Sequence, residues 1–262
     1  LSSVKIARLR IVQVLPKSTW HANDPPLGIP NISPGKQVLG TVPVESDGSA
    51  YFRAPAGKAL CFQALDEMGR AVQMMRSVTY VQPGEVVSCV GCHEPRNTAP
   101  RIDHVPLASV RAPSQIAPGP PGSRPLSFPI LVQPVLDRHC VECHGDKEPS
   151  GGIVLNGLPQ GRYTNSYLAL APYVPYADWA GRQGDFRKIN CEPVTQPGFF
   201  GARGSKLMEM LLTGHHDVRL TQDDWERLIT WMDCNVLFYG TFNFDAQKRQ
   251  QRGEVIAGPD LE

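Results

Sequence analysis

The sequence predicts an α+β fold, in which a β-sandwich-like domain precedes a mainly α-helical, loop-rich domain. Short apolar runs separated by turn residues follow one another from residue 4 to residue 81, as in small all-β domains. Apolar residues recur at helical spacing near the C-terminus, at Trp225, Leu228, Ile229 and Met232. A C-x-x-C-H motif follows the strand-rich part, and a second one ends the first helical stripe. We therefore assign residues 1–97 to the β domain, 98–124 to a Pro/Gly-rich linker and 125–262 to the helical domain.

The first domain is expected to consist of short strands joined by tight turns. Residues 4–15 alternate apolar and polar side chains in their middle, which indicates a strand with one buried face. The Asp47-Gly48 pair is typical of a two-residue hairpin turn. Further strands are expected at residues 38–44, 50–53, 59–65, 71–76 and 78–81.

The second domain is expected to contain four helices. Apolar residues from Phe128 to Leu136 form a stripe, in which Pro134 indicates a kink or a helix start. A short helix is expected at residues 164–171, and another at 205–212 with Gly214 at its end. Thr221 is expected to cap the last helix. We expect loops at 146–163 and 172–204, and an extended polar tail beyond residue 240.

The two C-x-x-C-H motifs predict two covalently attached c-type haems. Two thiols at this spacing can each form a thioether to a vinyl group, and the adjoining histidine reaches the iron from the proximal side. The cofactor-binding residues would be Cys89, Cys92, His93, Cys140, Cys143 and His144, with His93 and His144 as proximal ligands.

The alternative for these cysteines is a zinc site built from two C-x-x-C pairs. Such pairs are usually about 15–20 residues apart. Here 47 residues separate Cys92 from Cys140, and each pair carries an adjoining histidine. The pattern therefore favours haem over zinc.

Composition and charge exclude some classes of partner. The formal net charge is +1, which indicates no preference for nucleic acid. No run of 18 apolar residues is present, so no membrane span is expected. Because c-type cytochromes mature outside the cytoplasm, we expect a periplasmic or extracellular protein whose signal or upstream segment is missing from this chain.

Three further cysteines, Cys61, Cys191 and Cys234, lie outside the motifs. In an oxidising compartment Cys191 and Cys234 could pair, and the alternative is that all three are buried free thiols.

Several segments resemble one known family. The run from Val42 to Phe52 and the run from Ser88 to Arg96 are similar to the middle domain of the hydrazine synthase alpha subunit. The runs 128–145 and 214–220 resemble the cytochrome c domain that follows it. The resemblance implies one haem at the edge of the sandwich and one inside the helical domain. In the synthase a tyrosine stands four residues after the first proximal histidine, where this chain has Asn97.

The distal ligands are less constrained than the proximal ones. For the second haem we favour His215, which follows a predicted helix end and matches the family's Gly-His position; His216, Met208 and Met210 remain alternatives. For the first haem the candidates are His21, His104, a residue of another chain, or an open site. His139 adjoins Cys140 and could serve a neighbouring haem or chain.

Two functions follow from different classes. The first is dihaem electron transfer to redox partner proteins, as an electron carrier rather than an enzyme, with a homo-oligomer or conductive filament as an extension. The second is a redox enzyme acting on small nitrogen compounds or peroxide at an open first haem, as in hydrazine synthase.

Overall fold

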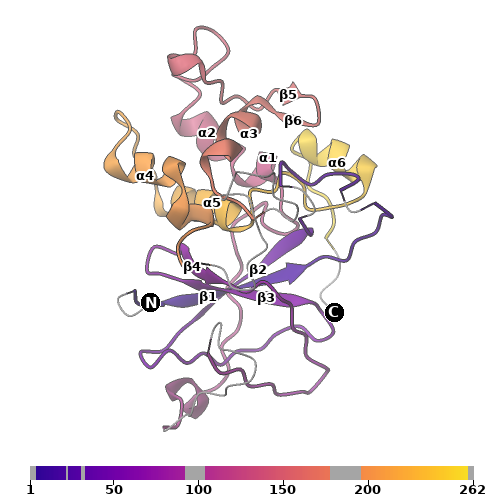
Figure 1. Cartoon of the computed structure of the whole chain (residues 1–262), viewed down its shortest axis with the longest axis vertical. Helices are drawn as coiled ribbons and strands as arrows, with labels where there is room; N and C mark the ends of the chain where they lie inside the picture. The colour runs from indigo at the N-terminus through magenta and orange to yellow at the C-terminus, as the bar shows by residue number, and fades with distance from the viewer. Residues whose placement is uncertain (1–3, 22, 31–32, 92–103, 178–195, 259–262) are drawn as a thin grey trace.

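The computed structural model describes residues 4–21, 23–30, 33–91, 104–177 and 196–258. Its organising element is a four-stranded antiparallel sheet with the order β2-β1-β3-β4 (Figure 1). The strands are β1 (Arg8–Val14), β2 (Lys36–Pro43), β3 (Leu60–Leu65) and β4 (Ala71–Met74).

Strand β1 lies in the interior of the sheet and pairs with both β2 and β3. Ile11 is opposite Gly40 on one side and Phe62 on the other, and the register shifts between Ile11 and Val12. Gly40 has a φ of 140°, and a Cβ atom there would lie 1.9 Å from the Ala117 carbonyl oxygen. Only glycine therefore lets the segment around Ala117 approach this strand.

The sandwich expected for residues 1–97 is corrected to one four-stranded sheet in the described part of that range. Residues 50–53 and 78–81 form only isolated bridges, Phe52 with Ser114 and Thr79 with Leu60. One face of the sheet buries a small cluster of Ile11, Leu39, Val42 and Leu60, against which Phe52, Ala54 and Ile116 pack. The second layer is therefore built from irregular segments and not from a second sheet, because these segments make few ladder hydrogen bonds.

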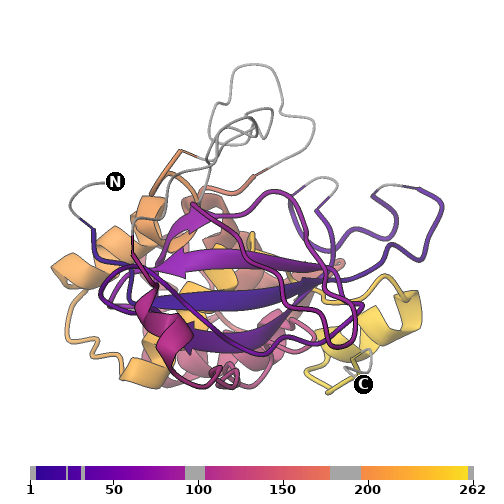
Figure 2. The same ribbon diagram turned by 90° about the horizontal axis from the view of Figure 1, so that it is seen from below.

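The helices lie on the opposite side of the sheet from the irregular segments and from the 3-10 helix Leu107–Val110 (Figures 1 and 2). They are α1 (Phe128–Leu131), α2 (Gln133–His139), α3 (Asn165–Leu170), α4 (Lys206–Thr213), α5 (Gln222–Asp233) and α6 (Phe244–Gln251). The break between α1 and α2 precedes Pro134, which occupies the first turn of α2. No described helix is long and apolar enough to cross a membrane.

Three helices begin at a capping side chain, and one of these, Thr221, confirms the cap predicted from the sequence. The side chains of Thr164, Ser205 and Thr221 accept hydrogen bonds from the first turns of α3, α4 and α5. The expected extended tail is wrong in part, because α6 forms there. The strands β5 (Pro159–Gln160) and β6 (Tyr163–Thr164) pair as a small antiparallel hairpin. This hairpin lies in the expected loop 146–163, except for its last residue.

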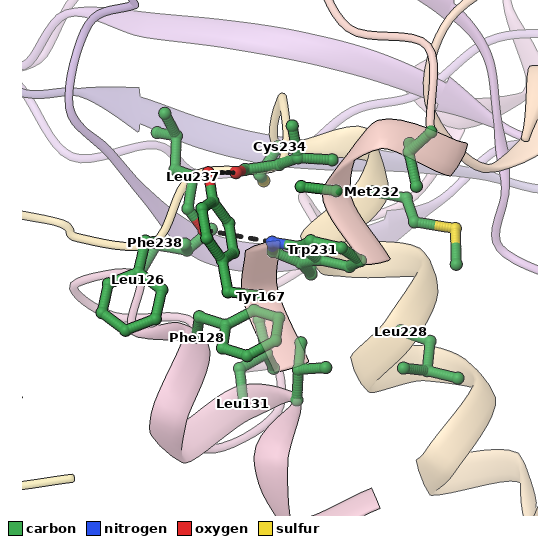
Figure 3. Packing of buried hydrophobic residues seen from close by; sticks show 14 of the residues in the cluster. Leu126, Phe128, Leu131, Tyr167, Leu228, Trp231, Met232, Cys234, Leu237 and Phe238 are labelled. Carbon is green, nitrogen blue, oxygen red and sulfur yellow. Dashed lines mark hydrogen bonds between the residues drawn. The ribbon is translucent and has the colours of Figure 1, made fainter. Parts of the chain in front are cut away.

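An aromatic cluster holds the helices together (Figure 3). The Phe128 ring lies 5.2 Å from the rings of Tyr167 and Trp231, and 5.5 Å from the Phe238 ring. Each polar end is satisfied: the Tyr167 hydroxyl donates to the Val236 carbonyl, and Trp231 Nε1 donates to the Leu237 carbonyl. Large rings with satisfied polar atoms make this the rigid base of the helical part.

The sheet and the helices share one hydrophobic cluster. Val12, Val38 and Cys61 of the sheet are buried in the same cluster as the helical residues. The predicted linker is also bound to the sheet where it is described, through hydrogen bonds between Thr41 and Ala117. Residues from both predicted domains therefore stabilise one core.

Candidate haem-binding site

The second C-x-x-C-H motif begins where α2 ends. Cys140 is the C-cap, and its N–H donates to the Leu136 carbonyl over 2.8 Å. The chain then turns, and the N–H of His144 donates to the Cys140 carbonyl over 2.9 Å. This turn leaves Cys140 half-buried and Cys143 exposed.

A backbone carbonyl orients the His144 ring. His144 Nδ1 lies 3.1 Å from the Ile153 carbonyl oxygen. Because a carbonyl only accepts hydrogen bonds, Nδ1 must carry the hydrogen, and Nε2 of the neutral ring keeps its lone pair. Histidines that bind metals are usually held by a hydrogen bond of this kind.

The ring of His215 faces the ring of His144. Their centroids are 6.0 Å apart and their planes differ by 18°. A metal–imidazole bond is about 2 Å long, and each ring centre lies roughly 1 Å behind its nitrogen, so two imidazoles on one metal ion have centroids about 6 Å apart. The observed separation of the ring centroids equals the distance expected for two imidazoles on one metal ion.

The structure separates His215 from its competitors. The His216 ring packs edge-on against His215 at 4.8 Å, and its φ of 50° turns it to the exposed surface. Met208 is buried in the main hydrophobic cluster, and Met210 is exposed. Of the four candidates, His215 is the one whose ring contact with His144 the structure records.

Burial lowers the pKa of His215, and the neighbouring His216 and His144 lower it further, which favours the neutral ring. Burial raises the pKa of Cys140 to about 11, with a smaller contribution from Cys143. The described ranges hold no group of three or more His, Cys, Asp or Glu side chains that could bind a metal ion.

The segments that carry the two histidines also carry partly buried apolar residues. Cys140, Ile153, Leu211 and Leu220 pack against the main cluster. Two thiols, two imidazoles and apolar residues in the same segments are the residue types that a covalently held haem requires.

The structure describes only the first part of the first motif. Cys89 is exposed, whereas Cys92 and His93 lie outside the described residues, so attachment at this motif stays a prediction. The segment leading to it carries exposed apolar side chains, among them Tyr80, Val86 and Val87. An attached haem would give such side chains an apolar surface to contact.

The histidines proposed for the first haem lie in different settings. His21 is on the exposed loop after β1, beside the fully exposed Trp20. His104 Nε2 lies 3.5 Å from a carboxylate oxygen of Asp47. The role of both histidines at this motif stays a prediction, because His93 lies outside the described residues.

Sequence reasoning missed one residue near the second site. Asp224 forms a capping box with Thr221, and its carboxylate also contacts Arg138 and His139. His139 is therefore paired within its own chain. The spacing Thr221-x-x-Asp224 is the capping-box pattern, which could have indicated this residue.

The structure describes two of the three cysteines that lie outside the motifs. Cys61 and Cys234 are buried free thiols. Cys191 lies outside the described residues, so its pairing with Cys234 stays a prediction.

Comparisons with known proteins point to one family. Residues 5–94 match the family described as the hydrazine synthase alpha subunit middle domain. No curated protein matches the chain. The fold is similar to that of the Kuenenia stuttgartiensis hydrazine synthase, with a TM-score of 0.59 and 18% identity over 97% of this chain. The chain spans 40% of that protein chain. These findings support a hydrazine synthase alpha-like family, and the structural similarity by itself shows the fold alone.

Proposed function

We propose that this chain is a dihaem c-type cytochrome that transfers electrons outside the cytoplasm. The observation that carries the proposal is the pair of rings of His144 and His215, whose centroids are 6.0 Å apart and whose planes differ by 18°. His144 directly follows the second of the two thiols, Cys140 and Cys143. A haem supplies a one-electron carrier when it is bound at such a site.

The chain's own residues have defined roles in this proposal. The sulfur atoms of Cys140 and Cys143 would hold the haem, and the imidazoles of His144 and His215 would bind its iron. The Ile153 carbonyl keeps the hydrogen of His144 on Nδ1, which leaves the Nε2 lone pair available. With both imidazoles bound, the site would leave no position for a substrate, which suits electron transfer.

The first motif is proposed to hold the second covalent haem, through Cys89, Cys92 and His93. Redox partner proteins, and a homo-oligomer or filament of this chain, are proposed as the routes by which electrons enter and leave. His21 remains the favoured distal ligand at this motif, with His104 as the alternative.

A second function is a redox reaction on small nitrogen compounds or peroxide at an open first haem. The match to the hydrazine synthase alpha middle domain favours it, because the matched residues 5–94 include Cys89, Cys92 and His93. In this case the site at His144 would deliver electrons to the reacting iron or remove them from it.

Intact mass and absorption spectra test both functions. The mature protein should exceed its polypeptide mass by two haems that resist acid–acetone extraction. Bound zinc, or a mass without haem, would contradict the proposal. If the reduced protein binds no carbon monoxide, both irons have two protein ligands and electron transfer is supported. Binding of one equivalent would support the enzyme instead.

A further inference from the structure

A buried carboxylate, Asp224, lies at the start of α5, and its partners belong to the segments that precede His144 and follow His215. The Asp224 side chain is only 1% exposed, although it belongs to the first turn of its helix. Buried carboxylates are costly unless hydrogen bonds and positive charges compensate them. Its partners therefore indicate which segments this residue holds.

One set of partners belongs to the haem-attachment segment. Arg138 Nη2 donates to Asp224 Oδ1, and His139 Nε2 lies 3.1 Å from Oδ2. These two residues end α2 and directly precede Cys140. The carboxylate thus contacts the last two residues before the motif that contains His144.

The other partner belongs to the loop of the facing histidine. The Thr221 N–H and hydroxyl donate to Asp224 Oδ2 over 2.9 and 2.7 Å. Thr221 is the end of the loop that begins at Gly214 and carries His215. Both segments that present an imidazole are therefore tied to the same carboxylate.

We propose that Asp224 is a positioning residue that holds the segments of His144 and His215 at the separation needed for both rings to bind one iron. The inference rests on the proposed function. A bis-imidazole site requires two ligands from distant parts of the chain to stay within a few tenths of an ångström of one geometry. A charged carboxylate that accepts hydrogen bonds from both segments restricts their relative movement.

A simple helix cap is the competing role for this residue. The cap involves the Thr221 contacts alone, in which the Asp224 N–H also donates to the Thr221 hydroxyl. Positioning requires the contacts to Arg138 and His139 as well. Variants that remove one set of contacts and keep the other therefore separate the two roles.

The decisive variant is Asp224→Asn in the holoprotein. An amide cannot accept from both segments through two charged oxygens, so His215 should leave the iron more often. The reduced variant should bind one equivalent of carbon monoxide more than the reduced wild type. The rate of this binding should rise about tenfold, as expected for the loss of a hydrogen bond to a charged group. Hydrogen exchange of residues 214–221 should rise in the same variant.

Two controls define the result. Asp223→Asn alters the neighbouring exposed carboxylate, whose side chain pairs with Arg227 and is 57% exposed, and it should leave both readouts unchanged. Thr221→Ala removes the capping hydroxyl but keeps Arg138 and His139 on Asp224, so its effect should be clearly smaller. An equal effect of Thr221→Ala and Asp224→Asn would reduce the role to a cap and overturn the inference.

A second route applies if Asp224→Asn does not yield a folded holoprotein. Arg138→Gln together with His139→Gln removes the contacts from the other side, where both side chains are partly exposed. The same rise in carbon monoxide binding is expected. If the wild-type protein carries this haem and the variants have unchanged spectra, the positioning role is overturned and the proposed function stands. Wild-type protein without a haem at His144 would overturn the proposed function itself.

Discussion

The Ile153 carbonyl determines how the His144 imidazole can be used. Its hydrogen bond to Nδ1 leaves Nε2 as the ring's free lone pair, on a side chain that follows the two thiols directly. Burial and, to a smaller extent, the neighbouring imidazoles lower the pKa of His215, which favours its neutral ring. Chemistry and geometry agree at this pair of residues.

We expect His215→Ala to convert one haem from low-spin to high-spin. The change removes the ring 6.0 Å from His144 and opens one axial position, so the reduced protein should bind one additional equivalent of carbon monoxide. His216→Ala should have little effect, since that ring contacts His215 edge-on at the exposed surface. Absorption spectra of both reduced variants provide the test. The opposite pattern would identify His216 as the ligand.

The candidate site could be predicted from the sequence only as far as its motifs reach. Cys140, Cys143 and His144 follow from a fixed spacing, and His215 follows from a helix end together with a family resemblance. Ile153 could not be found, because it contributes a backbone carbonyl that any residue would offer. Asp224 was missed because its contacts to Arg138 and His139 bridge positions more than 80 residues apart.

Among the elements, the helices with apolar periodicity were predicted, whereas α6 was not, although the Asn243 side chain caps it. Helix α6 docks through polar side chains: buried Gln250 donates to the Leu126 carbonyl, and buried Gln247 donates to the Thr241 carbonyl. A helix held by glutamines shows no apolar periodicity, which is the main sequence signal for a helix. The prediction of a sandwich was wrong for a related reason. Short apolar runs such as residues 78–81 resemble strands in the sequence, but only one isolated bridge forms there.

The turn after β2 depends on a carboxylate that also holds the 3-10 helix Leu107–Val110. Asp47 accepts hydrogen bonds from the Ser49 hydroxyl and from the Leu107 N–H. The Ser49 hydroxyl, the Leu107 N–H and the Ser49 N–H lower the pKa of Asp47 to about 2, with a smaller effect of His104.

Asp47 should therefore stabilise the fold above its ordinary pKa. Because the folded pKa is depressed, this contribution is complete above about pH 4 and is lost as the pH falls toward 2. Carbon-13 NMR of the Asp47 carboxyl should give a midpoint near 2. Ser49→Ala should raise the midpoint most, whereas His104→Ala should change it little. A midpoint near the ordinary value would contradict the role.

At the scale of the whole molecule, a buried ion pair joins the sheet to the helices. Arg10 Nη1 of β1 donates to Asp233 Oδ2 of α5 over 3.0 Å, and both side chains are at most 3% exposed. The same carboxylate accepts from the Ala71 and Ala202 N–H groups. Three distant segments of the chain therefore meet at one buried group, next to the shared hydrophobic cluster.

This arrangement predicts that the two parts unfold together. Arg10→Met leaves the Asp233 carboxylate buried without its cation, which should lower the free energy of unfolding by about 3–5 kcal/mol. Lys5→Met is the matched control, because the Lys5–Glu67 pair is exposed and such pairs contribute less than about 1 kcal/mol.

Hydrogen exchange followed by mass spectrometry distinguishes one cooperative unit from two. In the Arg10→Met protein, peptides from β1–β4 and from α1–α5 should lose protection to the same extent, because sheet and helical residues lie in one cluster. Protection lost from the strands alone would mean that the helical part folds independently, as two separate domains would.

The buried Asp233 carboxyl also predicts a pH dependence. Since burial raises the pKa of Asp233 and Arg10 opposes this, removing Arg10 should raise the pKa further. The carboxyl would then take up a proton more readily, and the penalty of Arg10→Met should become smaller as the pH falls toward the raised pKa.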